Sequence, residues 1–317
     1  MNGVLLVDKP IGPTSHDVVA KLRRRLGTRQ VGHAGTLDPQ ASGLLVVLCD
    51  EATKLQAILM GHAKRYRASV VLGVATDSFD AAGARTRVLE IPEWLRAELL
   101  GMTGSANNHE LTPHRTPRIF EALCIERQRT EQRPPAHSAI HVNGRRSYEL
   151  ARRGEEPELA PRSIDVQALT CVGAACAQGD AQGELVLEMA VSKGYYVRAL
   201  ARDLGENLGV PAHLGALRRL SSGPFHVEDA IDPACDDATL RSSLRPMDQV
   251  VSQVVPVSVL TEQGVMKARR GQVLRATDFD SPNPTPDLSA WMDSVGALVA
   301  LGRAGEDGWR VERGFRQ

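Results

Sequence analysis

The nine residues from Val31 to Pro39, Val-Gly-His-Ala-Gly-Thr-Leu-Asp-Pro, place one carboxylate, Asp38, where it could support chemistry. Two glycines suit a tight loop, and a proline directly after Asp38 disfavours helical geometry at the carboxylate. The apolar run at 41–48 is typical of a buried strand. A carboxylate on a loop that enters the core needs a cation or several donors to stay ionised. An Asp that only caps a turn is the simpler alternative.

A second stretch, at 191–205, could supply that cation. Its sequence predicts a strand that ends at Gly194 and a helix over 195–208, with Arg198 in the first turn of the helix. An arginine that enters a core needs a carboxylate, and its planar guanidinium suits bidentate pairing. We therefore predict a direct salt bridge between Asp38 and Arg198, with nitrogen and oxygen atoms within about 3 Å.

Two further stretches carry residue types that bind nucleic acid. Lys-Arg-Tyr-Arg-Ala at 64–68 opens an apolar strand predicted over 65–74, where Tyr66 is either a stacking platform or an aromatic at the edge of the core. An Arg-Pro-Pro sequence at 133–135 predicts an extended segment, followed by an arginine-rich helix from Asn143 through Arg153. Its basic residues favour either a phosphate-facing surface or a solvated face.

These stretches must be positioned by a larger set of elements. A capping box from Thr14 to Asp17 predicts a helix that continues to about Leu26 and ends at Gly27. The remaining expected elements are a strand at 3–7, helices at 51–60 and 91–101, loops at 77–83 and 103–116, and strands at 163–173 and 183–191. The tail beyond about residue 235 reads as β-rich, with strands at 254–259 and 296–301.

Composition narrows the class of protein. The chain has 317 residues, 42% hydrophobic and 24% charged, which predicts a globular protein of two domains. Its five cysteines are an odd number without a Cys-x-x-Cys pair, which disfavours a disulfide framework or a zinc site and favours a reducing cytoplasm. No apolar run approaches eighteen residues, so we expect no membrane span, and the N-terminal residues do not resemble a secretory signal.

Charge is balanced overall but unevenly distributed. Lys plus Arg and Asp plus Glu both total 38. Basic residues gather at 21–29 and 126–153, whereas acidic residues gather at 155–158 and 228–237. Segregated charge can create a basic face on a neutral protein, although a solvated mixed surface is the simpler reading of each run.

Taken together, these stretches resemble the bacterial tRNA pseudouridine-55 synthase family, the TruB-type pseudouridine synthases, over residues 3–225. Five motifs occur in family order: Gly-x-Leu-Leu-x-Asp-Lys-Pro, Gly-His-x-Gly-Thr-Leu-Asp-Pro, Lys-x-Tyr, Pro-Pro with its arginine-rich segment, and Ser-Lys-Gly-x-Tyr-x-Arg. The chain departs from the family in having His137 in place of a Tyr, Tyr195 in place of a Thr and Val191 in place of a Cys.

The resemblance implies an α/β (α+β) fold in which helices flank a mixed, largely antiparallel sheet, the pseudouridine synthase fold. The catalytic domain would span 1–240 and a small β-rich PUA-like domain 241–317. Within the catalytic domain, we expect a mobile loop region at about 103–120 and a segment that contacts RNA at about 126–153.

The resemblance also implies an isomerase that converts a T-loop uridine of tRNA to pseudouridine after flipping the base. The expected partner is the T stem-loop of tRNA, bound by a cytoplasmic monomer without a cofactor, a metal, a protein partner or a membrane. The residues carried over from the family are the nucleophile Asp38, its partner Arg198, the stacking Tyr66, the base-pocket residues Tyr196 and Leu217, the gap-filling His33, and the substrate-binding Lys9.

Three other functions have to be weighed. An RNA-binding or RNA-folding module with secondary catalysis would not need a buried carboxylate. A glycoside hydrolase normally needs two flanking acids, and no second acidic motif accompanies Asp38. A guide-RNA-dependent relative is disfavoured by the compact N-terminus and the lack of a lysine-rich tail.

Overall fold

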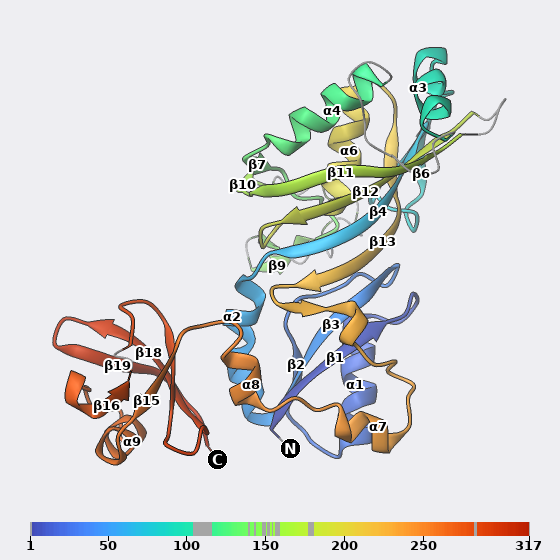
Figure 1. Cartoon of the computed structure of the whole chain (residues 1–317). Helices are drawn as coiled ribbons and strands as arrows, with labels where there is room; N and C mark the ends of the chain where they lie inside the picture. Colours follow the sequence, from blue (N-terminus) through green and yellow to red (C-terminus); the bar gives the residue numbers. More distant parts are fainter. Residues whose placement is uncertain are drawn as a thin grey trace. The chain divides into compact units, whose positions relative to one another are not determined.

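The computed structural model describes residues 2–103, 116–138, 140–142, 144–147, 150, 153, 155, 159–176, 181–281 and 284–316. The backbone forms two compact units (Figure 1). The first unit contains 1–39, 43–61 and 222–317, and the second contains 40–42 and 62–221. The first unit is therefore assembled from segments far apart in the sequence, whereas the second is almost continuous.

The N-terminal strands of the first unit are antiparallel. Strand β1 (Gly3–Lys9) pairs with β3 (Ala41–Cys49) from Gly3 opposite Cys49 to Lys9 opposite Gly43. The short strand β2 (Val31–His33) also pairs with β3. Strands β1 and β3 are buried along almost their whole length, which agrees with the apolar runs predicted at 3–7 and 41–48.

Helix α1 (Ser15–Leu26) packs its apolar face against these strands, with Val18, Val19 and Leu22 in their common core. The predicted capping box is confirmed: the Thr14 side chain accepts from the Asp17 N–H, and Asp17 accepts from the Thr14 N–H at 2.9 Å. The helix ends at Gly27, whose φ of 68° lies in the left-handed region that glycine adopts without strain.

The helix predicted at 51–60 is present as two pieces, the 3-10 helix η1 (Asp50–Leu55) and helix α2 (Gln56–Gly61). After residue 222 the chain returns to the first unit through β14 (Phe225–His226), η2 (Val227–Asp229), α7 (Asp237–Ser242) and α8 (Met247–Val251). Backbone hydrogen bonds tie this return to β1, from Asp8 N–H to Ile231 O and from Val4 N–H to Arg245 O, each 2.9 Å.

The C-terminal part of the first unit contains a five-stranded sheet in the order β16-β15-β17-β18-β19. Its strands are β15 (Val257–Leu260), β16 (Phe279–Ser281), β17 (Ser289–Met292), β18 (Leu298–Gly305) and β19 (Gly308–Gly314). Helix α9 (Glu262–Arg269) and the 3-10 helix η3 (Ala276–Asp278) accompany the sheet. Its core surrounds the fully buried Trp291. The expected β-rich tail is confirmed, while the domain boundary expected between 240 and 241 stays a prediction.

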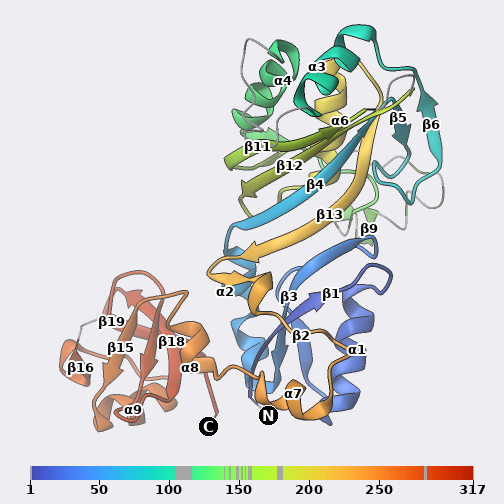
Figure 2. The same ribbon diagram turned by 45° about the vertical axis from the view of Figure 1, so that its right-hand side comes forward.

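The second unit is built on four long strands. They lie side by side in the order β13-β4-β12-β11 (Figure 2). Strand β4 (Lys64–Leu72) is antiparallel to β12 (Gly183–Val191), which is antiparallel to β11 (Val166–Ala175). Strand β13 (Ala212–Ser222) was not predicted, because Gly215 and adjacent arginines interrupt its apolar pattern.

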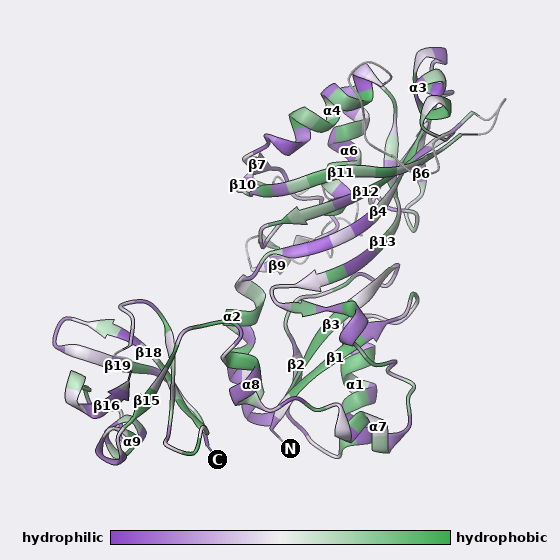
Figure 3. Cartoon of the chain, in the orientation of Figure 1, coloured by the Kyte–Doolittle hydropathy of each residue, from purple (hydrophilic) through white to green (hydrophobic). Residues whose placement is uncertain are grey.

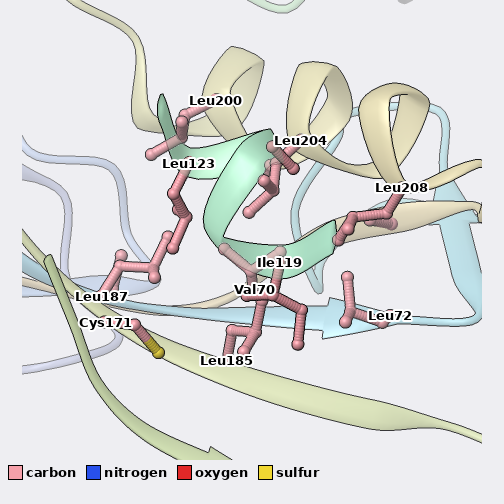
Figure 4. Close-up of a cluster of buried hydrophobic side chains, with 14 of the residues drawn as sticks. Val70, Leu72, Ile119, Leu123, Cys171, Leu185, Leu187, Leu200, Leu204 and Leu208 are labelled. Carbon is pink, nitrogen blue, oxygen red and sulfur yellow. The ribbon is translucent and has the colours of Figure 1, made fainter. Parts of the chain in front are cut away.

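Helices cover the core of the second unit. These are α3 (Glu93–Thr103), α4 (Pro117–Arg127) and α6 (Val197–Leu208). Figure 4 shows leucines of α6 and residues Ile119 and Leu123 of α4 meeting strand residues such as Leu185. Helix α4 was not predicted, although Pro117 at its first turn is a common helix-start signal. The mobility expected at 103–116 lies mostly outside the described residues.

Short strands complete the second unit. Strand β5 (Val74–Thr76) pairs with β6 (Arg85–Val88), and β7 (Glu131–Gln132) pairs with β10 (Arg162–Ser163). The structure corrects the start of the helix predicted from Asn143 through Arg153, because strands β8 (His141–Val142) and β9 (Arg145–Arg146) form a hairpin there. Ser147 and Leu150 are helical, and residues 148–149 and 151–152 lie outside the described residues. Gly144 has φ of 80°, and Asn-Gly is a strong signal for a tight hairpin turn.

The fold class expected from the sequence is confirmed: helices flank mixed, largely antiparallel sheets, and the C-terminal region is β-rich. Within the described residues, no helix combines the length and the apolar character that crossing a membrane would require.

Candidate active site

The loop that carries Asp38 is held from the N-terminal side by α1. The Ser15 hydroxyl accepts a hydrogen bond from the Leu37 N–H at 2.8 Å and donates to the Leu37 O at 2.9 Å. Ser15 is only 2% exposed and Leu37 is also buried, so water does not compete for these groups. The residue before Asp38 is therefore fixed by a contact between positions far apart in the sequence.

The residue after Asp38 is fixed as well. The Pro39 carbonyl accepts from the Gly12 N–H at 2.8 Å and from the Lys9 ammonium at 3.4 Å. Lys9, which is 0% exposed, also donates to the carbonyls of Pro10 and Pro13, each at 2.8 Å. These contacts with three carbonyls show that Lys9 supports the loops around Asp38. Its family-derived role in substrate binding stays a prediction.

His33 lies at the end of β2, where the chain enters the same loop. Its carbonyl accepts from the Gln56 side-chain amide at 2.9 Å, and the next residue, Ala34, donates to Val46 O at 2.9 Å. Gly35 then adopts φ of 113°, which is accessible to glycine and strained for other residues. These contacts confirm the expected tight loop, and they place Asp38 half-buried on it.

In the second unit, Tyr66 and Leu217 come from two long strands. Tyr66 is on β4 opposite Met189 of β12, and Leu217 is on β13. Both are partly buried and pack against the apolar core that α4 and α6 cover. The first half of β4 is hydrophilic and appears purple in Figure 3, so Tyr66 stands among polar residues at the start of a strand whose later half is apolar.

Tyr196 lies at the junction between β12 and α6, directly before the first helical residue. Its N–H donates to the Gln132 side-chain oxygen at 2.9 Å, and its carbonyl accepts from the Gln132 amide nitrogen at 3.2 Å. The same carbonyl accepts the first hydrogen bonds of α6, from Ala199 at 3.1 Å and Leu200 at 3.2 Å. The helix predicted from 195 thus begins two residues later, with its entry fixed by a glutamine side chain.

Arg198 lies in the first turn of α6, as predicted, and its guanidinium contacts groups from two separate loops. It donates to Ser78 O at 3.3 Å and to His137 O at 2.9 Å, and its Nη1 lies 3.6 Å from a carboxylate oxygen of Asp80. The side chains of Arg198 and Asp80 are both mostly buried. The backbone at His137, where the family has Tyr, still supplies an acceptor for Arg198.

Two further charged groups have perturbed proton affinities. Burial, together with the positive charges of Arg219 and Lys193, lowers the pKa of Lys64 to about 8. Arg219 itself is only 1% exposed. Burial raises the pKa of Glu126, even though Arg129 contacts its carboxylate. Both groups lie in the second unit, and Lys64 is two residues from Tyr66.

The predicted site residues thus fall into two sets. Asp38, His33 and Lys9 belong to the first unit, whereas the other four belong to the second: Tyr66, Tyr196, Arg198 and Leu217. The salt bridge between Asp38 and Arg198 stays a prediction.

Three supporting residues were missed from the sequence: Ser15, Gln132 and Asp80. Two of them bind main-chain atoms, and such contacts leave no side-chain pattern in a sequence. The part of the chain that the structure describes has no group of three or more His, Cys, Asp or Glu residues suited to hold a metal ion.

Comparisons with known proteins agree with this arrangement of motifs. The family model described as "TruB family pseudouridylate synthase (N terminal domain)" matches residues 23–103 and 102–197. The model of the "tRNA pseudouridylate synthase B C-terminal domain" matches 198–252. Two curated relatives named tRNA pseudouridine synthase B are each 37% identical. The one from Corynebacterium aurimucosum matches over 95% of this chain and 91% of its own length, and the one from Cutibacterium acnes over 96% and 94%.

Solved structures share the fold. A chain from an H/ACA RNP bound to a substrate RNA containing 2'-deoxyuridine has a TM-score of 0.68 at 23% identity, over 99% of this chain and 85% of that one. A chain from a Cbf5-Nop10-Gar1 complex has a TM-score of 0.66 at 25% identity, over 99% and 84%. With family models covering most of the chain and relatives matching nearly all of it, this protein belongs to the TruB family of pseudouridylate synthases.

Proposed function

We propose that this protein isomerises uridine to pseudouridine in tRNA, at position 55 of the T loop, with Asp38 as the nucleophile and without a cofactor. The relatives that match nearly the whole chain are named tRNA pseudouridine synthase B. The T loop and the single carboxylate come from the motif resemblance around Asp38 and Arg198. We also propose that the protein acts as a cytoplasmic monomer whose partner is the T stem-loop.

The observation that favours this proposal most is that hydrogen bonds hold the residues on both sides of Asp38. Ser15 holds the residue before it, and Gly12 with Lys9 holds the residue after it. A nucleophile must approach the reacting atom closely, and a misplacement of about 1 Å can cost about a hundredfold in rate. A loop that merely capped a turn would not need a buried lysine and a buried serine fixing its carbonyls.

The reaction breaks the bond between N1 of uracil and C1′ of the ribose and forms a bond from C5 to C1′. One proton leaves C5 and N1 gains one, so the conversion is an isomerisation and needs no oxidant or reductant. Asp38 attacks either the base or the ribose. Arg198 keeps the carboxylate ionised and oriented, Tyr66 stacks on the base, and Tyr196 with Leu217 lines its pocket.

The substrate uridine must first leave its stack. Flipping costs a few kcal/mol, least for a loop nucleotide that is poorly stacked, and stacking on Tyr66 returns about 1–3 kcal/mol. Because these energies are similar, phosphate contacts must supply most of the net affinity. In this scheme His33 fills the space that the extruded nucleotide leaves.

The test is to incubate the purified protein with a T stem-loop hairpin and map pseudouridine by chemical probing. We expect conversion at the T-loop uridine by the wild-type protein. Asp38→Asn keeps the shape of the side chain but removes the nucleophile, so it should abolish conversion while hairpin affinity stays within about tenfold. Tight binding without conversion by the wild-type protein would favour an RNA-binding module, and measurable turnover by Asp38→Asn would remove Asp38 from its role.

A further inference from the structure

Gln132 fixes the main chain at the start of α6. It lies on β7, is 2% exposed, and uses both ends of its side-chain amide on one residue. Its oxygen accepts from the Tyr196 N–H at 2.9 Å, and its nitrogen donates to the Tyr196 carbonyl at 3.2 Å. The amide therefore pairs with the main chain of Tyr196 as a neighbouring strand would.

Two arginines of α6 attach the residues that follow Gln132 to the same helix. Arg202 donates to Arg133 O at 3.1 Å, and Arg198 donates to His137 O at 2.9 Å. The segment 132–137 is thus fastened to the first turns of α6 at three places. Gln132 contacts Tyr196, the residue directly before the first residue of the helix.

The position of Gln132 is itself fixed. It lies opposite Arg162 in the pairing of β7 with β10, and Ile164 donates to Thr130 O at 2.9 Å beside this pair. Strand β11 then follows β10 along the chain. Gln132 therefore connects the β7–β10 pair to the N-terminal end of α6, where Tyr196 and Arg198 lie.

We propose that Gln132 is a positioning residue for the isomerisation. By holding both main-chain groups of Tyr196, it places the Tyr196 ring in the base pocket and the Arg198 guanidinium two residues later. This inference rests on the proposed function of those two residues. Gln132 itself does not touch the reacting atoms, so its loss should affect the rate of conversion far more than the affinity for RNA.

The first experiment compares Gln132→Met with wild type in single-turnover reactions, in which the enzyme is in saturating excess over the T stem-loop hairpin. Methionine keeps the length of glutamine but can make neither hydrogen bond. We expect the conversion rate to fall by about 10- to 100-fold, as misplacement of a reacting group does, with the Kd for RNA within about threefold. Gln128→Met is the matched control, because Gln128 is exposed at the end of α4, and it should retain the wild-type rate.

The second experiment uses Gln132→Glu, which separates positioning from loss of folding. A protonated glutamic acid accepts from the Tyr196 N–H and donates to the Tyr196 carbonyl, whereas its ionised form repels that carbonyl. Because burial raises the pKa of a carboxyl group, lowering the pH from about 8 to about 6 should restore the variant. The ratio of its rate to the wild-type rate should rise by up to about tenfold per pH unit, in samples shown to be folded by circular dichroism.

The outcomes are distinct. If wild type converts the hairpin and Gln132→Met does so within about twofold of its rate, the positioning role is wrong. If Gln132→Met does not fold, a pH-independent rate ratio for Gln132→Glu overturns the role instead. If wild type itself fails to convert any uridine, the proposed function is wrong, and the positioning role that rests on it is wrong as well.

Discussion

At Arg198, two carbonyls and a carboxylate converge on one guanidinium. Ser78 O, His137 O and Asp80 are supplied by two loops that are far apart in the sequence. A planar group with five donors can contact them together, and a compact ammonium cannot. The protein itself thus holds Arg198 in one orientation before any substrate binds.

We expect Arg198→Lys to lower the single-turnover rate by about 10- to 100-fold, although the charge is retained, because lysine loses the fixed fork geometry. Rapid-quench measurement on the hairpin gives the rate. Arg303→Lys is a suitable control, since Arg303 forms an exposed ion pair with Glu312 in the C-terminal sheet and should tolerate the change. An undiminished rate for Arg198→Lys would contradict both the role assigned to the fork geometry and the predicted contact with Asp38.

Lys64 provides a prediction about pH. Burial and the charges of Arg219 and Lys193 lower its pKa from 10.5 to about 8. In the window between these two values the unfolded chain binds more protons than the folded protein, so folding stability gains from Lys64 as the pH rises. Relative to Lys64→Met, the free energy of unfolding of wild type should increase by up to about 3 kcal/mol from about pH 8 to about pH 10.5.

Urea titrations of both proteins across this range measure the effect. The comparison with Lys64→Met cancels the titration of the cysteines and tyrosines, which both proteins share. A difference between the two proteins that stays constant with pH would show that Lys64 titrates as an exposed lysine does.

At the scale of elements, α1 positions the Asp38 loop through Ser15. The hydroxyl is buried and bonds to both main-chain groups of Leu37. Ser15→Ala should leave these groups without that partner and destabilise the protein by about 1–3 kcal/mol. Its single-turnover rate should also fall, because Leu37 adjoins the nucleophile.

Asp236→Ala is the control for stability. Asp236 caps α7 by accepting from the Thr239 N–H at 2.9 Å, and its loss should cost about 1 kcal/mol without a change in rate at temperatures where the protein is folded. Thermal melts and rates on both variants separate the two effects. Equal rates for Ser15→Ala and Asp236→Ala would show that Ser15 only stabilises the fold.

The accuracy of the sequence predictions depends on how local their signals are. Helix α1 was predicted at both ends, because its capping box and its terminal Gly27 are signals within a few residues. The hairpin at Gly144 was mistaken for the start of a helix because Asn143 was interpreted as a helix N-cap and not as the first residue of an Asn-Gly turn. Strand β13 was missed because Gly215 and its arginines interrupt the apolar pattern, and the pairing with β4 that places the strand joins segments far apart in the sequence.

The same reasoning applies to the candidate site. Motifs located Asp38, Tyr66 and Arg198, since these residues lie within short distinctive sequences. The support from Gln132 could not be predicted, because its partners are main-chain atoms 64 positions away. A glutamine in a short strand carries no signal of such a contact until the backbone is known.

At the scale of the whole molecule, ion pairs divide the basic residues into two groups. Arg25 pairs with Asp237 at 2.6 Å, and Arg129 pairs with Glu126 at 2.6 Å. Arg24 and Arg29, from the same basic run as Arg25, are exposed. Only part of the charge segregation seen in the sequence is therefore presented at the surface.

RNA affinity should fall with increasing salt concentration despite the zero net charge. Each phosphate neutralised on single-stranded RNA should add about 0.7 to the slope of log Kd against log salt concentration. Arg24→Gln and Arg29→Gln should each reduce this slope if they face phosphates. Arg25→Gln should leave the slope unchanged and lower the melting temperature, because its partners are within the protein. Filter binding at several salt concentrations tests this, and a slope near zero for wild type would rule out an electrostatic RNA surface.

The interrupted path of the first unit has a consequence for synthesis on the ribosome. Residues 62–221 form one almost continuous unit that can fold while translation continues. Strand β1 is made first, yet its backbone partners Ile231 and Arg245 emerge more than two hundred residues later. The Glu51 carboxylate accepts a 2.8 Å hydrogen bond from the N–H of Arg316, which is synthesised later still. The nascent chain must therefore carry one edge of β1 without these partners for most of its synthesis, and an unpaired strand edge is a site where aggregation can begin unless a chaperone covers it.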